Sequence, residues 1–183
     1  MYYILIPSAF ERPLSIVWQE TIDGPKIYQI FLSDKKEPLE KLVHSNFADA
    51  SLQSCSFIKV LGEQINKFLA GESVAFNLEA VALEECSEFQ RKVLSACFDI
   101  PRGWISTYGR IAESMGIPGG ARAVGSALSH NPFPVVIPCH RVVRSDGHSG
   151  GFRSGPEMKR SLLELEKVKF TKNGKVLTDR IYY

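Results

Sequence analysis

The spacing of apolar residues changes along this chain, from a strand-like period near the N-terminus to a helical period beyond it. Three short stretches rich in β-branched and aromatic residues are typical of strands: Tyr2 to Ile6, Leu14 to Gln19 and Lys26 to Leu32. Asp23-Gly24 is a turn signal that predicts a hairpin between the last two. Strands followed by helices predict an α+β fold that starts with a small antiparallel sheet.

Two helices are expected after these strands. The first is short and spans about residues 38–44. The second spans residues 57–69 and keeps its apolar side chains on one face. Ser54 or Ser56 is expected to cap its start, and Gly71 to end it.

Residues 1–84 are therefore expected to form a structural N-terminal domain, and the acidic stretch from Glu79 to Glu88 to serve as the linker. His44 and Cys55 are the residues here that a metal site would use. No second ligand pair is suitably spaced, which favours a surface histidine, a buried cysteine and no metal.

The two halves of the chain differ in charge. Residues 1–86 hold 7 Lys and Arg against 12 Asp and Glu, whereas residues 87–183 hold 15 against 8, and the net charge is +2. This asymmetry suggests that the C-terminal half meets a polyanion. Ordinary solvated charge is an equally good explanation on this evidence alone.

A helix-turn-helix is predicted in the C-terminal half. Ser87 and Gln90 form a capping box, in which Ser87 caps the helix and Gln90 reaches back, and Cys97 lies on the apolar face of that helix. A second helix is expected over residues 107–115 and a third over about 120–129, with a turn of glycine and proline between them.

The third helix is unusual because most of its residues are small. Glycine destabilises a helix interior, so the small residues need a reason. One reason is tight packing against a neighbouring helix. The other is close approach to DNA, since a minor groove about 6 Å wide admits a helix only if its side chains are short or the groove is opened. The small residues are Ala121, Ala123, Gly125, Ser126 and Ala127.

Between Val135 and Val143 an apolar run leads into Pro138, Cys139, His140 and Arg141. A cysteine acts as a nucleophile in its thiolate form, which neighbouring cationic groups favour. A lone cysteine is more often a small buried hydrophobe, but the flanking residues favour the reactive interpretation.

The sequence Pro138-Cys139-His140-Arg141-Val142 resembles the active-site motif of the O6-alkylguanine-DNA alkyltransferases, the methylated-DNA–protein-cysteine methyltransferases. The resemblance covers about residues 89–166 and includes blocks at 105–112, 121–125 and 131–132. Several blocks in order are a strong signal. The family resemblance implies a ribonuclease-H-like N-terminal domain and a DNA-binding, alkyl-acceptor domain at residues 85–166.

The resemblance also assigns the catalytic roles. Cys139 takes the alkyl group from the damaged base and keeps it. His140 accepts the thiol proton through a water molecule, a carboxylate holds the imidazole, and Tyr108 donates a proton to the leaving guanine. Glu166 matches the family's carboxylate, and spacing favours it over its neighbour Glu164.

In the family, the arginine matching Arg122 enters the duplex in place of the flipped nucleotide, and the tyrosine matching Tyr108 pushes on the neighbouring phosphate. Extrusion is needed because the base stack hides the alkyl carbon. A simple phosphate contact and a packing aromatic are the alternatives. Asn131 is expected to brace the helix-turn-helix against the active-site loop. The predicted DNA-binding residues are Thr107, Tyr108, Ala121, Arg122, Ala123, Gly125 and Arg141.

The predicted substrate pocket comprises Asn131, Val142, Phe152, Arg153 and Ser154. Its loop departs from the family, which most often has tyrosine, serine and glycine where Phe152, Arg153 and Ser154 stand. Phe152 loses a hydroxyl and Ser154 adds bulk, so the tolerance for large O6 groups is left open.

The expected function is single-turnover DNA repair of O6-alkylguanine in double-stranded DNA by methyl transfer to Cys139, with no metal or cofactor. Two alternatives are a DNA-damage sensor that transfers nothing and a cysteine hydrolase that uses Cys139, His140 and Glu166. Cys139 argues against the sensor, and the hydrolase leaves the small-residue helix and Arg122 unexplained.

The remaining expectations concern the chain as a whole. A β-hairpin is predicted in the extension at residues 167–183, around Asn173-Gly174 and packed on the N-terminal domain. The four cysteines fit neither a zinc site nor a disulfide framework, and no apolar run is long enough to span a membrane. A cytoplasmic monomer is expected, nucleoid-associated in a prokaryote, without an obligate protein partner.

Overall fold

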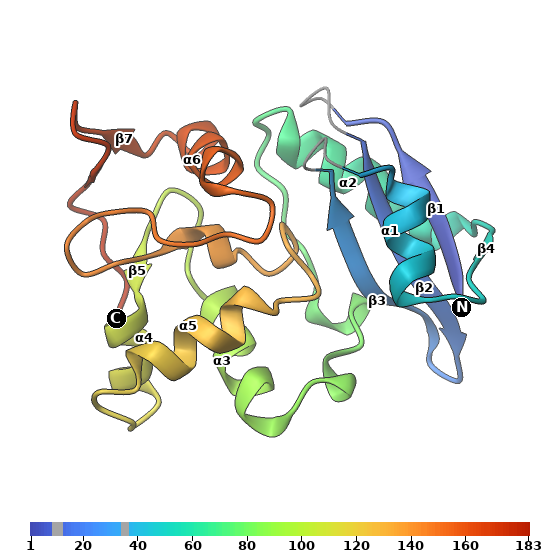
Figure 1. Cartoon of the computed structure of the whole chain (residues 1–183), viewed down its shortest axis with the longest axis horizontal. Helices are drawn as coiled ribbons and strands as arrows, with labels where there is room; N and C mark the ends of the chain where they lie inside the picture. Colours follow the sequence, from blue (N-terminus) through green and yellow to red (C-terminus); the bar gives the residue numbers. More distant parts are fainter. Residues whose placement is uncertain (9–12, 34–36) are drawn as a thin grey trace. The chain divides into compact units, whose positions relative to one another are not determined.

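The computed structural model describes residues 1–8, 13–33 and 37–183 (Figure 1). The chain divides into two compact units. Unit 1 comprises residues 1–85 and 132–136, and unit 2 comprises residues 86–131 and 137–183. Within the described ranges, no helix has the length and apolar character that a membrane span requires.

Unit 1 is built on a four-stranded sheet. Its strands are β1 (Tyr2–Ile6), β2 (Leu14–Thr21), β3 (Gly24–Leu32) and β4 (Ser51–Leu52), in the order β3-β2-β1-β4. β2 and β3 form the predicted hairpin. β4 pairs parallel with β1, so the expectation of an antiparallel sheet is wrong at this edge. Two exposed residues carry no alternation pattern, so β4 could not be predicted from periodicity.

Helices α1 (Leu39–Asn46) and α2 (Ser56–Leu69) cover opposite faces of this sheet (Figure 1). The first packs on the face that carries Tyr3 and Val17, and the second places Gly62 against Ile6. Both faces are thus covered, which explains why β2 is buried without alternation.

Several predictions about unit 1 need correction. The N-cap of α2 is Cys55 without a side-chain hydrogen bond, so neither serine caps the helix. Cys55 is partly buried rather than core, and His44 is exposed as predicted. The first part of the acidic stretch is packed on unit 1 and is not a free linker. Val81 and Ala82 are buried, and the Ala82 backbone N–H donates a hydrogen bond to the Ile27 carbonyl.

Unit 2 contains four α-helices among its described residues: α3 (Glu88–Phe98), α4 (Tyr108–Ser114), α5 (Ala121–Ser129) and α6 (Pro156–Leu165). The pair α4 and α5 forms the predicted helix-turn-helix, and α3 packs against both (Figure 1). Inward residues such as Val93, Ile111 and Val124 are completely buried, so the apolar faces of the three helices form one core.

The capping box is half right. The Ser87 hydroxyl accepts a hydrogen bond from the Gln90 backbone N–H, as predicted. The Gln90 side chain does not reach back; its amide donates to the carbonyls of Ala127 and His130 at the end of α5. Carbonyls at a helix end lack the full set of intrahelical partners, and this contact supplies a donor to two of them.

The C-terminal extension belongs to unit 2, so the expectation that it packs on the N-terminal domain is wrong. The predicted hairpin is present as β7 (Lys169–Phe170) and β8 (Val176–Leu177). Phe170 and Val176 pack on a cluster that includes Ile105 and Leu163. The apolar side of this hairpin therefore completes the core of unit 2.

Candidate active site

A short parallel sheet organises the candidate site. Strand β5 (Ser106–Thr107) pairs with strand β6 (Val142–Val143). β5 leads directly into α4, where the Thr107 hydroxyl caps the helix by accepting the Arg110 backbone N–H. β6 follows the 3₁₀ turn η3 (Cys139–Arg141). The pairing therefore brings the start of the helix-turn-helix to the cysteine turn.

Cys139 lies in this turn and is only 7% exposed. The Asn131 side-chain amide donates hydrogen bonds to the Cys139 Sγ at 3.1 Å and to the Ile137 carbonyl at 3.0 Å. Burial raises the pKa of the Cys139 thiol, and the Asn131 hydrogen bond and the charge of Lys159 oppose this increase. The resting group is therefore the thiol, and it needs a base to become nucleophilic.

His140, Arg141 and Glu166 form a buried network. The His140 Nε2 lies 2.9 Å from the Glu166 Oε1, and Arg141 donates from Nε and Nη2 to the same carboxylate at 2.7–3.1 Å. The backbone N–H of Gly103 adds a further donor at 3.0 Å. Glu166 is fixed by these contacts immediately after α6.

The network determines the protonation of the imidazole. Burial raises the pKa of Glu166, but the contacts with His140 and Arg141 outweigh it and lower the pKa to about 2. Burial lowers the pKa of His140, against the pull of Glu166. A neutral imidazole beside an ionised carboxylate donates from Nε2, which leaves the buried Nδ1 as an acceptor. His140 is thereby set up as a base.

Tyr108 begins α4 and is half-buried. Its ring lies against Gly125 of α5, and its hydroxyl lies beside Gly150, where a Cβ would approach to 2.9 Å. Burial, followed by the nearby Cys139 and Cys97 thiols, raises the pKa of Tyr108. The hydroxyl therefore stays protonated at neutral pH and can donate.

Lys159 belongs to the site, although it was not among the residues predicted from the sequence. Its side chain is completely buried, and its Nζ donates to the Val142 carbonyl at 2.6 Å. One signal was present: a lysine stands three and four residues before Leu162 and Leu163, on the apolar face of α6.

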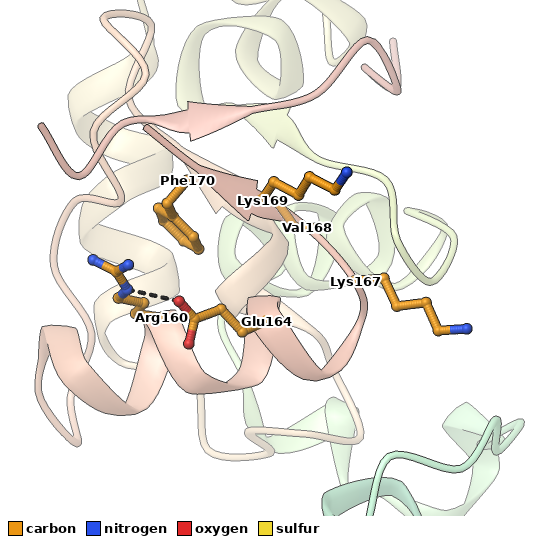
Figure 2. Close-up of a pocket in the computed structure, with 6 residues that line it drawn as sticks. All are labelled: Arg160, Glu164, Lys167, Val168, Lys169 and Phe170. Carbon is orange, nitrogen blue, oxygen red and sulfur yellow. Dashed lines mark hydrogen bonds and ion pairs between the residues drawn. The ribbon is translucent and has the colours of Figure 1, made fainter. Parts of the chain in front are cut away.

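The hollow between α6 and β7 is separate from this chemistry. Figure 2 shows the ion pair of Arg160 and Glu164 lying in it, with Lys167 directed away from the pair. None of the predicted site residues lines this hollow. Because Glu164 is exposed and paired with Arg160, Glu166 is the carboxylate that reaches His140.

Three comparisons place the chain among known proteins. Residues 88–168 match the model of the 6-O-methylguanine DNA methyltransferase DNA-binding domain. A Methanosarcina acetivorans methylated-DNA–protein-cysteine methyltransferase is 32% identical over 166 residues, which is 91% of this chain and 98% of the relative. The chain belongs to the methylated-DNA–protein-cysteine methyltransferase family.

Further relatives support this assignment. A family member from Methanothermobacter thermautotrophicus is 48% identical over 111 residues, and the alignment spans 61% of this chain and 62% of that relative. The crystal structure of Mycobacterium tuberculosis OGT in complex with DNA has a TM-score of 0.74 at 30% identity, covering 91% of this chain and 93% of that one. The likeness to solved structures thus includes both units.

Besides Tyr108, which is described above, the predicted DNA-binding residues fall into three groups. Arg122 and Ala123 are exposed on α5, and Ala121 is partly exposed beside them. Thr107 and Gly125 have internal roles, since Thr107 caps α4 and Gly125 packs on Tyr108. Arg141 is 8% exposed and bound to Glu166, so the structure contradicts its assignment as a DNA contact.

Two residues of the predicted substrate pocket lie next to the cysteine turn. Asn131 contacts the thiol directly, and the Val142 carbonyl is held by Lys159. Phe152 and Ser154 are half-buried and Arg153 is exposed, on the loop that leads into α6. No metal-binding cluster occurs among the residues that the structure describes.

Proposed function

We propose that this protein repairs DNA by direct damage reversal, moving the alkyl group of O6-alkylguanine in duplex DNA onto Cys139. The observation that carries the proposal is that Asn131 contacts the Cys139 Sγ while Glu166 holds the imidazole of the next residue, His140, in the same turn. The relatives named above carry this activity in their names. The alignments with the first curated relatives span about 62% of the length of those relatives. The substrate and the DNA partner of this chain are therefore proposed as well, rather than taken over from the relatives.

The chemistry uses protein groups in sequence. The His140 Nδ1 takes the Cys139 proton through a water molecule, and the thiolate attacks the alkyl carbon in line. The S–C bond forms as the C–O6 bond breaks, and the electron pair leaves on the guanine. Tyr108 then donates its proton to that anion. The thioether is stable to water, so each protein reacts once, and no step calls for a metal or a cofactor.

Access to the base requires extrusion of the nucleotide through the minor groove. The exposed face of α5 supports this role, since Arg122 is its one long side chain beside small residues. Tyr108 lies between α5 and the 150 loop, and in the proposed reaction its hydroxyl meets the base or its phosphate. We further propose that the protein acts as a monomer in a reducing compartment, the cytoplasm or nucleoid, which keeps the thiol available.

The test is incubation with a duplex that contains one O6-methylguanine, followed by tryptic peptide mapping. Cleavage after Arg122 and Arg141 isolates Cys139 from the other three cysteines. One added methyl group on this peptide, and none in Cys139→Ala, is expected. Methylation of Cys97 or Cys55 instead would overturn the site assignment.

Stoichiometry separates the competing functions in the same experiment. A repair protein of this kind stops at one methyl group per molecule. A damage sensor binds the duplex and transfers nothing, whereas a cysteine hydrolase cycles without retaining a group.

A further inference from the structure

Lys159 is a buried ammonium whose polar contacts are all neutral oxygens. Its Nζ donates to the carbonyls of Val142 at 2.6 Å and Gly151 at 3.3 Å, and to the Tyr108 hydroxyl at 3.4 Å. Among the described residues, no carboxylate forms an ion pair with it. A buried cation without a counter-ion is costly, so its retention needs an explanation.

The groups that face Lys159 come from three elements. Cys97 of α3 is completely buried and its pKa is raised well above the usual value, and the pKa of Tyr108 of α4 is also raised, so both remain neutral. Cys139 and His140 both belong to η3: Lys159 and Cys139 each shift the pKa of the other, and the charge of Lys159 helps to lower the pKa of His140. Burial lowers the pKa of Lys159 to about 8, which leaves it mostly charged at neutral pH.

The proposed reaction creates a negative charge on one of these groups. When His140 removes the Cys139 proton, the thiolate becomes the anion facing the Lys159 ammonium. Arg141, the other buried cation nearby, is already bound to Glu166. A neighbouring opposite charge in a buried site favours the ionised form of a thiol and so lowers its pKa.

We propose that Lys159 is the internal counter-cation of the active site, stabilising the Cys139 thiolate while it holds Tyr108 and the 142 and 151 carbonyls in place. This role of Lys159 in catalysis rests on the proposed alkyl transfer. Lys159 gains and loses no proton in this step: the thiol proton goes to His140, and the negative charge moves from sulfur to the guanine as the alkyl group is transferred. Lys159 is thus a positioning and electrostatic residue.

The experiment measures the Cys139 pKa without DNA. The rate of Cys139 alkylation by iodoacetamide is followed from pH 6 to 10 by mass spectrometry of the 123–141 peptide. Lys159→Gln removes the charge but keeps an amide that can donate to the two carbonyls, and Lys159→Met removes both. Arg160→Met, an exposed neighbour on α6, is the matched control.

Both neutral variants are expected to raise the Cys139 pKa by about one unit or more, which makes alkylation at pH 7 about tenfold slower. Lys159→Arg should keep most of the wild-type rate, and Arg160→Met should match wild type. An unchanged pKa in a folded Lys159→Gln variant would overturn the proposal and leave Lys159 a structural residue.

Should neither neutral variant fold, the wild-type profile provides the test. Coupling to Lys159 predicts that Cys139 alkylation rises over a broader pH range than a single ionisation. A pH profile of Cys139 alkylation that fits a single ionisation would contradict the proposal. Iodoacetamide alkylation needs no DNA, so this test is independent of the proposed function. If the Lys159 variants shift the Cys139 pKa but the wild-type protein transfers no methyl group, the proposed function fails and the counter-cation role of Lys159 stands.

Discussion

At the scale of single residues, the structure changes the role of Arg141. The sequence motif places it beside the nucleophile, where a phosphate contact is a natural expectation. In the fold its guanidinium binds Glu166 and donates to the Ile100 carbonyl at 2.6 Å. Arg141 keeps Glu166 ionised, and Glu166 in turn orients His140. The effect of Arg141 on the nucleophile therefore passes through two other side chains.

Arg141→Met is accordingly expected to destabilise the protein by about 3–5 kcal/mol, because it removes the positive charge and the hydrogen bonds that compensate the buried Glu166 carboxylate. Urea unfolding gives this value. Affinity of the folded variant for undamaged duplex should change little. Arg144→Met, at an exposed position, is the control for stability. If Arg141→Met were as stable as wild type but lost affinity for DNA, Arg141 would have to be a phosphate contact after all.

Arg122 is the opposite case, since it is exposed on α5. If Arg122 replaces the extruded nucleotide, Arg122→Ala should slow methyl transfer from duplex DNA far more than reaction with free O6-alkylguanine base. Single-turnover rates on both substrates provide the measurement. Equal losses on the two substrates would defeat the extrusion role.

At the scale of secondary-structure elements, the turn between α4 and α5 sets the geometry of the helix-turn-helix. Gly120 precedes α5, and a Cβ there would lie 2.8 Å from the Ile117 carbonyl oxygen. Gly109, inside α4, has only the Thr107 hydroxyl near its Cβ position, at 3.9 Å. The two glycines thus have different reasons to be present, although both lie in the helix-turn-helix.

Gly120→Ala is expected to cost about 1–3 kcal/mol, because the backbone must move to relieve the overlap. Gly109→Ala should be neutral or stabilise the protein by up to ~1 kcal/mol, since alanine is the better helix former. Thermal unfolding of the two variants gives the comparison. Equal effects would mean that the turn accommodates a Cβ.

At the scale of the whole molecule, the buried His140–Glu166–Arg141 network links folding to pH. The pKa of His140 is lowered by burial, so the unfolded chain binds more protons below about pH 6.5 and stability falls as pH decreases. Glu166 has a folded pKa of about 2 against 4.5 for an ordinary glutamate, so its contribution is full above 4.5 and is lost as pH falls towards 2.

Urea midpoints measured between pH 8 and 3 should therefore decline below about pH 6.5 and more steeply below 4.5. Because the pKa of Glu166 is lowered in the folded protein, its contribution to stability is fully present at neutral pH. Glu166→Gln should be less stable at pH 7, and the difference from wild type should shrink as the pH falls below 4.5. A constant difference across this range would exclude the linkage.

The sequence alone determined the α+β class, the hairpin of β2 and β3 and the helix-turn-helix, because these follow from local periodicity. Its resemblance to a known family, through the motif around Cys139 and the blocks on either side, also singled out Cys139, His140 and Glu166. Only the tertiary structure decided which side chains contact one another in the site. The pairing of β5 with β6 and the burial of Lys159 and Arg141 join residues distant in sequence. Such contacts depend on long-range packing and on the cost of burying charge, and neither is visible in a local pattern.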